Sequence, residues 1–224
     1  AIKMNTVSQR PEFFELHNGS KSPLPFSAAE YERRLTALRQ LMSDKGLRAV
    51  LLTSMHNVAY YSGFLYCSFG RPYACIVTET SCTTISANID LGQPWRRSYG
   101  DNLIYTDWKR DNYWRAVNHV LPQTDLVGIE GDHLTLAARQ KMESLNSHLQ
   151  AEDISNDIMT LRMIKSAEEI ALIKGGARIA DVGGAAVRDA IQTGAREIDV
   201  AMAGRDAMEL AIARDYPDSE IRDT

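Results

Sequence analysis

The sequence is short of cysteine and of long apolar runs, and each shortage excludes a class of protein. Its three cysteines, Cys67, Cys75 and Cys82, form no C-x-x-C pair, so neither a disulfide framework nor a structural zinc site is expected. No apolar run approaches the ~18 residues that cross a bilayer. Residues 1–25 contain no apolar core of a secretory signal. We therefore expect a cytoplasmic protein with reduced thiols.

The motifs of several catalytic classes are also missing. None of the five histidines lies four residues from another, and no H-E-x-x-H occurs, so no metal site is expected. There is no G-x-S-x-G nucleophile motif and no G-x-G-x-x-G after a strand. The sequence thus predicts neither a metal nor an organic cofactor, and it contains no recognisable catalytic nucleophile.

The bulk composition is that of a globular protein. Of the 224 residues, 44% are apolar and 24% are charged, which predicts a packed core. A net charge of −4 argues against nucleic acid or an anionic membrane as the main partner, because either would favour a basic face. The length fits one large domain, or one domain and part of another.

Strand and helix patterns alternate over residues 1–160, which predicts an α/β domain around a mixed sheet. A capping box at Ser27 and Glu30 opens the first helix, and Gly46 ends it. Before it, residues 1–25 are interpreted as an extended arm or coil lying on a neighbour. Further helices are predicted at 55–61, 110–121 and 133–146, and strands at 48–53, 73–78, 82–88, 102–107, 126–130 and 151–155, with a hairpin turn at 79–81.

Residues 161–224 contain only helical patterns. A second capping box, Ser166 with Glu169, opens a helix that runs toward Ile191, and another helix is predicted within 193–216. Two helices cannot bury their apolar stripes alone, so we interpret this part as the beginning of an incomplete second domain in a longer protein. A helical dimerisation tail is the alternative.

The stretch "FLYCSFGRPYA" (64–74) contains the strongest candidate binding residue, Arg71. Gly70 permits unusual backbone angles and Pro72 restricts Arg71 to extended conformations, so the side chain is held on one heading. Arginine suits bidentate capture of a carboxylate or phosphate. An internal ion pair with an Asp or Glu explains it equally well. Two other charged, aromatic stretches, 94–97 and 107–111, are interpreted as solvated loops or subunit contacts.

Several stretches together resemble the N-terminal half of the creatinase family (creatine amidinohydrolases). That family belongs to the pita-bread superfamily, which includes aminopeptidase P and prolidase. The resemblance begins near residue 15 and reaches the end of the chain, and Gly63 departs from it by replacing an acidic residue. It rests on "HNGSKSPLPFSAAEY", "SMHNVAYYSGFLYCSFGRPYA", "ISANIDLGQPWRRS", "YTDWKRDNYW" and "RMIKSAEEI…ARIADVGGAAV".

The resemblance implies a homodimer that hydrolyses creatine to sarcosine and urea without a metal, with active sites at the subunit boundary. It implies that Phe69 and Arg71 reach into the neighbouring subunit's site, where Arg71 binds the substrate carboxylate. The acid/base histidine is expected just beyond Thr224, so this chain contains no catalytic residue and is expected to be inactive alone. A metal-dependent X-Pro peptidase and a non-catalytic pita-bread binding module are the alternatives.

Overall fold

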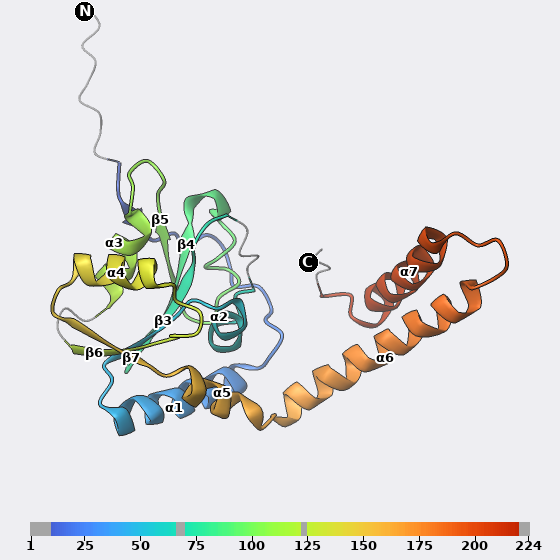
Figure 1. Ribbon diagram of the computed structural model, residues 1–224, viewed down its shortest axis with the longest axis horizontal. Helices are drawn as coiled ribbons and strands as arrows, with labels where there is room; N and C mark the ends of the chain where they lie inside the picture. The colour runs from blue at the N-terminus through green and yellow to red at the C-terminus, as the bar shows by residue number, and fades with distance from the viewer. Residues whose placement is uncertain (1–9, 66–69, 122–124, 220–224) are drawn as a thin grey trace, which may run out of the picture. The chain divides into compact units, whose positions relative to one another are not determined.

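The computed structural model describes residues 10–65, 70–121 and 125–219. The chain divides into two compact units, residues 1–163 and residues 164–224. In the described part of the chain, no helix is both long and apolar enough to cross a membrane. The first unit contains the sheet, and the described part of the second contains two helices (Figure 1). Arg71 belongs to the first unit.

The first unit is built on a seven-stranded mixed sheet of order β1-β5-β4-β3-β2-β6-β7. The pairs β4–β5, β2–β6 and β6–β7 are parallel, and the other three are antiparallel. This confirms the predicted mixed-sheet α/β fold, including the hairpin between β3 and β4. The strands are β1 (Phe13–Phe14), β2 (Ala49–Leu52), β3 (Ala74–Thr78), β4 (Cys82–Ala87), β5 (Asp101–Tyr105), β6 (Asp125–Ile129) and β7 (Leu149–Asp153).

Helices cover both faces of the sheet, as Figure 1 shows. In β2, Ala49 and Leu51 belong to one core cluster, and Val50 and Leu52 to the other, because side chains alternate between the faces of a strand. One cluster includes residues of α3 (Asn112–Val120) and α4 (Leu136–Leu145). The other includes residues of α1 (Ala28–Lys45), α2 (Met55–Ser62) and α5 (Ser155–Met163). Central strands buried on both faces explain their nearly continuous apolar sequences.

The described part of the N-terminal arm lies on its own domain. Phe13 and Phe14 form β1 and pair with β5, and the Lys21 ammonium donates to the carbonyl oxygens of Trp95, Ser98 and Gly100 at 2.7, 2.7 and 2.6 Å. The described part of the arm is therefore held by the chain's own first unit, and its contact with a neighbour stays a prediction. A two-residue strand carries no alternating pattern, so only the pairing with β5 reveals it.

Other elements near the end of the first unit also differ from the predictions. Strand β7 begins at Leu149 and ends at Asp153, before the predicted end, and α5 follows it where no helix was predicted. Helix α4 begins at Leu136 because Thr135 caps it, its hydroxyl accepting from the Ala138 amide at 3.2 Å. His133 therefore lies in the turn before α4, where its side chain can contact Thr53 in the loop after β2.

Helix α1 is fixed by a buried cluster of charge and aromatic rings. The Ser27 hydroxyl accepts from the Glu30 amide at 3.2 Å, as the capping box predicts. The Glu30 carboxylate accepts from the Nε atoms of Arg33 and Arg34 at 2.9 and 2.7 Å. Hydrogen bonds from Arg33 and Arg34 lower the pKa of Glu30 to about 2, against the opposing effect of burial. The Arg34 guanidinium lies 4.1 Å from the ring centroid of Tyr60.

Glu30 should make the free energy of unfolding of the first unit depend on pH in the acid range. Its folded pKa of about 2 lies below the ordinary 4.5, so its contribution is fully present above pH 4.5 and is lost as pH falls toward 2. We expect Glu30→Gln to lower the free energy of unfolding by about 1–3 kcal/mol at pH 7 and to have much less effect near pH 2. Urea titrations at several pH values test this, with exposed Glu79→Gln as the control. An equal loss at both pH extremes would contradict the assignment.

Gly63 shows why one departure from the family resemblance is tolerated. This glycine ends α2 with a left-handed φ of 76°. A Cβ atom there would lie 2.7 Å from the Tyr31 hydroxyl oxygen, so a side chain would need a local shift. The glycine therefore suits both the backbone and the packing of this chain.

The second unit is a pair of helices, α6 (Ala167–Ala190) and α7 (Glu197–Asp215). The predicted capping box is present in full at Ser166 and Glu169. A Cβ atom added to Gly183 would lie 2.6 Å from Met208 Cγ, so this glycine permits close approach of the helices. Many large apolar side chains are exposed on the pair, among them Ile170, Leu172, Ile173, Ile198, Met202 and Leu210.

Candidate functional site: the Arg71 turn

The turn that contains Arg71 is tied to the domain at its base. Gly70 has a φ of 82°, the left-handed region that glycine adopts readily. The Tyr105 hydroxyl, at the end of β5, donates to the Pro72 carbonyl oxygen at 2.8 Å. The Tyr113 hydroxyl, on α3, donates to the Tyr73 carbonyl oxygen at 3.4 Å. The backbone just after Arg71 is therefore anchored to two elements, as expected for a side chain that must keep one heading.

Arg71 forms an ion pair with Asp107. The distance from Arg71 Nη1 to Asp107 Oδ1 is 3.1 Å, and the two side chains are 46% and 35% exposed. The internal ion pair that the sequence left open is therefore present. An exposed edge of the guanidinium can still receive a second carboxylate, because the group offers five N–H donors. Phe69, the other predicted binding residue, lies outside the described residues.

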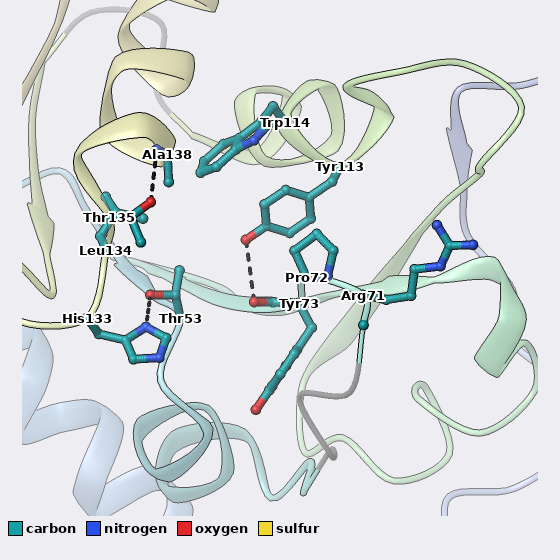
Figure 2. A pocket seen from close by; sticks show the side chains of 11 residues that line it. Thr53, Arg71, Pro72, Tyr73, Tyr113, Trp114, His133, Leu134, Thr135 and Ala138 are labelled. Atoms are coloured by element: carbon teal, nitrogen blue, oxygen red, sulfur yellow. Dashed lines mark hydrogen bonds between the residues drawn. The ribbon is translucent and has the colours of Figure 1, made fainter.

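Two pockets meet at this turn. Figure 2 shows the larger, of about 340 Å³, with the Arg71 side chain extending away from Thr53, His133 and Trp114. Its walls are mainly apolar and aromatic; Arg71 is part of its lining, but the guanidinium points away from Thr53 and His133. The other pocket, of about 270 Å³, contains both members of the ion pair in its lining, with Lys109 and Arg110 nearby. This smaller pocket is the candidate anion site.

The charges around the smaller pocket are largely paired. The Lys109 ammonium lies 2.7 Å from a carboxylate oxygen of Glu12, and that of Lys141 lies 2.8 Å from Asp111. The hydrogen bond from Lys109 lowers the pKa of Glu12. Arg71 is also paired, with Asp107, but its side chain is 46% exposed, so its guanidinium keeps room for a ligand. Arg110 is a second exposed cation in the lining of this pocket. The predicted solvated loop at 107–111 thus contributes directly to this pocket.

Sequence reasoning missed a buried carboxylate, Glu130, at the end of β6. It is 2% exposed and accepts hydrogen bonds from the backbone amides of Thr53 and Ser54, the latter at 2.8 Å. It also accepts from the Ser54 hydroxyl at 2.5 Å and the Asn57 amide at 2.6 Å. Glu130 thereby fixes the start of α2. A carboxylate ending a buried strand was the available signal, but its partners lie far away in the sequence.

His133 lies beside this cluster, at the rim of the larger pocket. Its Nδ1 lies 2.9 Å from the Thr53 hydroxyl oxygen, so the ring is oriented by the loop that follows β2. Among residues 10–65, 70–121 and 125–219, no group of three or more His, Cys, Asp or Glu could hold a metal ion. The Arg71 turn presents a charged, half-exposed guanidinium, a group suited to binding and orienting an anion.

Comparison with known proteins identifies the family. The model of the "Creatinase/Prolidase N-terminal domain" matches residues 34–164. Creatinase from Bacillus sp. (strain B-0618) is 50% identical over 93% of this chain and 52% of the relative. An uncharacterized hydrolase/peptidase, y4tL, from Sinorhizobium fredii is 24% identical over 80% of this chain and 50% of the relative. The chain thus spans about half the length of these relatives.

Solved structures show the same fold. Prolidase from Pyrococcus horikoshii OT3 superposes with a TM-score of 0.66 at 22% identity, over 80% of this chain and 48% of that one. Prolidase from Pyrococcus furiosus gives 0.65 at 24% identity, over 79% and 52%. The resemblance to the creatinase family is confirmed. By its mixed sheet and by the family model that matches most of its first unit, the chain belongs to the Creatinase/Prolidase N-terminal domain family.

Proposed function

We propose that this chain is the N-terminal part of a protein that hydrolyses creatine to sarcosine and urea. The observation that carries the proposal is the 50% identity to a creatinase over 93% of the chain. Relatives named as a hydrolase/peptidase and a putative dipeptidase reach only 24% and 21%. The prolidase structures share the fold at lower identity, and fold alone does not assign a substrate.

The Arg71 turn supplies substrate binding in this proposal. Creatine has a guanidinium at one end and a carboxylate at the other, so its site needs acids at one end and a cation at the other. Arg71 is anchored, charged and half-exposed, which suits the carboxylate end. Following the family resemblance, Arg71 and Phe69 act across the boundary of a homodimer. Residues 161–224 then open the pita-bread domain, in a cytoplasmic enzyme.

The reaction breaks the bond between the guanidinium carbon and the sarcosine nitrogen. Water attacks the carbon while a general base takes a proton from the water. A proton then passes to the departing sarcosine nitrogen. The family resemblance assigns this transfer to a histidine beyond Thr224. Arg71 makes and breaks no bond; it fixes the substrate's orientation, and such positioning is worth several kcal/mol when the geometry is right.

Turnover of creatine by the full-length protein tests the proposal. We expect urea and sarcosine in equal amounts, at a rate that a chelator such as EDTA leaves unchanged. Cleavage of X-Pro dipeptides that EDTA abolishes, without creatine turnover, would instead assign a metal-dependent peptidase. Binding of creatine without turnover, or no heat of binding in calorimetry, would indicate a non-catalytic module. Either outcome would overturn the proposed activity.

A further inference from the structure

Asp107 lies on a backbone that is held from both sides. It comes two residues after β5, and the preceding Thr106 amide donates to the Glu12 carbonyl oxygen at 2.9 Å. The Asn112 side-chain amide, at the start of α3, donates to the Thr106 carbonyl oxygen at 3.0 Å. The indole of Trp108 donates to the Pro11 carbonyl oxygen at 2.8 Å. The carboxylate therefore projects from a rigid point, although its side chain is partly exposed.

Arg71 also lies on an anchored backbone, but its side chain is much longer and has more freedom than that of Asp107. The carbonyl oxygens of the next two residues are held by Tyr105 and Tyr113, so the backbone heading is set. The side chain beyond it has several rotatable bonds and is 46% exposed. A free arginine loses much conformational entropy when it is fixed on a ligand. The contact with Asp107 supplies a fixed point that reduces this loss before the ligand arrives.

The ion pair is poorly suited to stabilising the fold. Both side chains are more than a third exposed, and exposed ion pairs contribute little to stability. The guanidinium contacts the Asp107 carboxylate through its Nη1 atom. Further N–H donors on the same planar group can face a second carboxylate. This geometry suits an arginine shared between an internal carboxylate and a ligand carboxylate.

We propose that Asp107 is a positioning residue, which holds the Arg71 guanidinium ready for the substrate carboxylate. The proposal rests on the proposed function and adds a residue to it. Asp107 also repels the incoming carboxylate, but at an exposed site water screens this repulsion strongly. The preordering of Arg71 is therefore the larger effect, and the net result of the ion pair is tighter substrate binding.

Steady-state kinetics of the full-length protein test this assignment. Asp107→Asn removes the charge and keeps the shape, and we expect the KM for creatine to rise about two- to fivefold, equivalent to roughly 0.4–1 kcal/mol, the range of an exposed ion pair. The kcat should change less than twofold, because the residue touches no reacting atom. Asp107→Glu keeps the charge, so its KM for creatine should rise less than that of Asp107→Asn. In an Arg71→Ala background, Asp107→Asn should have no further effect, because the two residues act together.

The controls separate failure of the inference from failure of the proposed function. Exposed Asp44→Asn, on α1, should leave both constants unchanged, and the melting temperature should be the same in all variants. If the wild-type protein turns over no creatine, the proposed function fails. If it does, an unchanged KM in Asp107→Asn overturns the positioning role. A lower KM in Asp107→Asn would identify Asp107 as a competitor of the substrate carboxylate, which also overturns the positioning role. The same holds if Asp107→Asn still raises the KM in the Arg71→Ala background, because Asp107 would then act through another residue.

Discussion

Arg71→Ala should raise the KM for creatine in the full-length protein about 100-fold. Truncation removes charge-assisted hydrogen bonds to the substrate carboxylate, and a hydrogen bond to a charged group is worth about 1.5–3 kcal/mol. A 100-fold change corresponds to about 2.7 kcal/mol, within that range. The fold should remain intact, because Arg71 is half-exposed and its pair with Asp107 contributes little to stability. Initial rates over a range of creatine concentrations measure the effect.

Two further variants define what the arginine supplies. Arg71→Lys keeps the charge and loses the planar fork, so its KM should fall between those of the wild type and the alanine variant. Arg139→Ala removes an exposed arginine that pairs with Glu143 on α4, and it should leave the KM unchanged. A KM for Arg71→Ala equal to that of the wild type would remove the carboxylate-binding role.

Glu130→Ala should lower the free energy of unfolding of the first unit by about 3–5 kcal/mol. The substitution leaves the backbone amides of Thr53 and Ser54 and the buried side chain of Asn57 without their acceptor. Removing one partner of such a buried charged network costs much more than an average hydrogen bond. All three tryptophans lie within residues 1–163, so urea denaturation followed by tryptophan fluorescence reports on this unit.

Matched variants separate hydrogen bonding from packing at this position. Glu130→Gln keeps one acceptor oxygen and the side-chain volume, so its loss of stability should be smaller than that of the alanine variant. Glu143→Ala removes an exposed carboxylate on α4 and should change the unfolding free energy by less than about 0.5 kcal/mol. A loss below about 1 kcal/mol for Glu130→Ala would show that the cluster does not stabilise the fold.

Local signals predicted most of the fold. Ser27 and Gly46 mark the ends of α1 because capping depends on residues that are close in sequence. The central strands were recognisable because burial on both faces makes them short apolar runs. Strand β1 and helix α5 were missed for the opposite reason. Phe13 and Phe14 are strand residues only through pairing with β5, and α5 offers few apolar side chains to the core beyond Ile158.

The candidate site was predictable only as far as its local geometry. Gly70 and Pro72 indicated that Arg71 is held on one heading, and the structure shows the anchored turn. Its partner Asp107 could not be named, because the two meet only when β3 and β5 are arranged in one sheet. Glu130 was missed in the same way, since its acceptor role depends on the parallel pairing of β2 and β6.

One comparison tests the central claim, that Arg71 binds the carboxylate of creatine. N,N-dimethylguanidine keeps the guanidinium of creatine and lacks its carboxylate, so its inhibition constant reports on the rest of the site. In the full-length protein, Arg71→Ala should raise the KM for creatine about 100-fold and leave that inhibition constant within twofold of the wild type. The claim would be contradicted if Arg71→Ala weakened the binding of both molecules equally, or if it weakened the binding of neither.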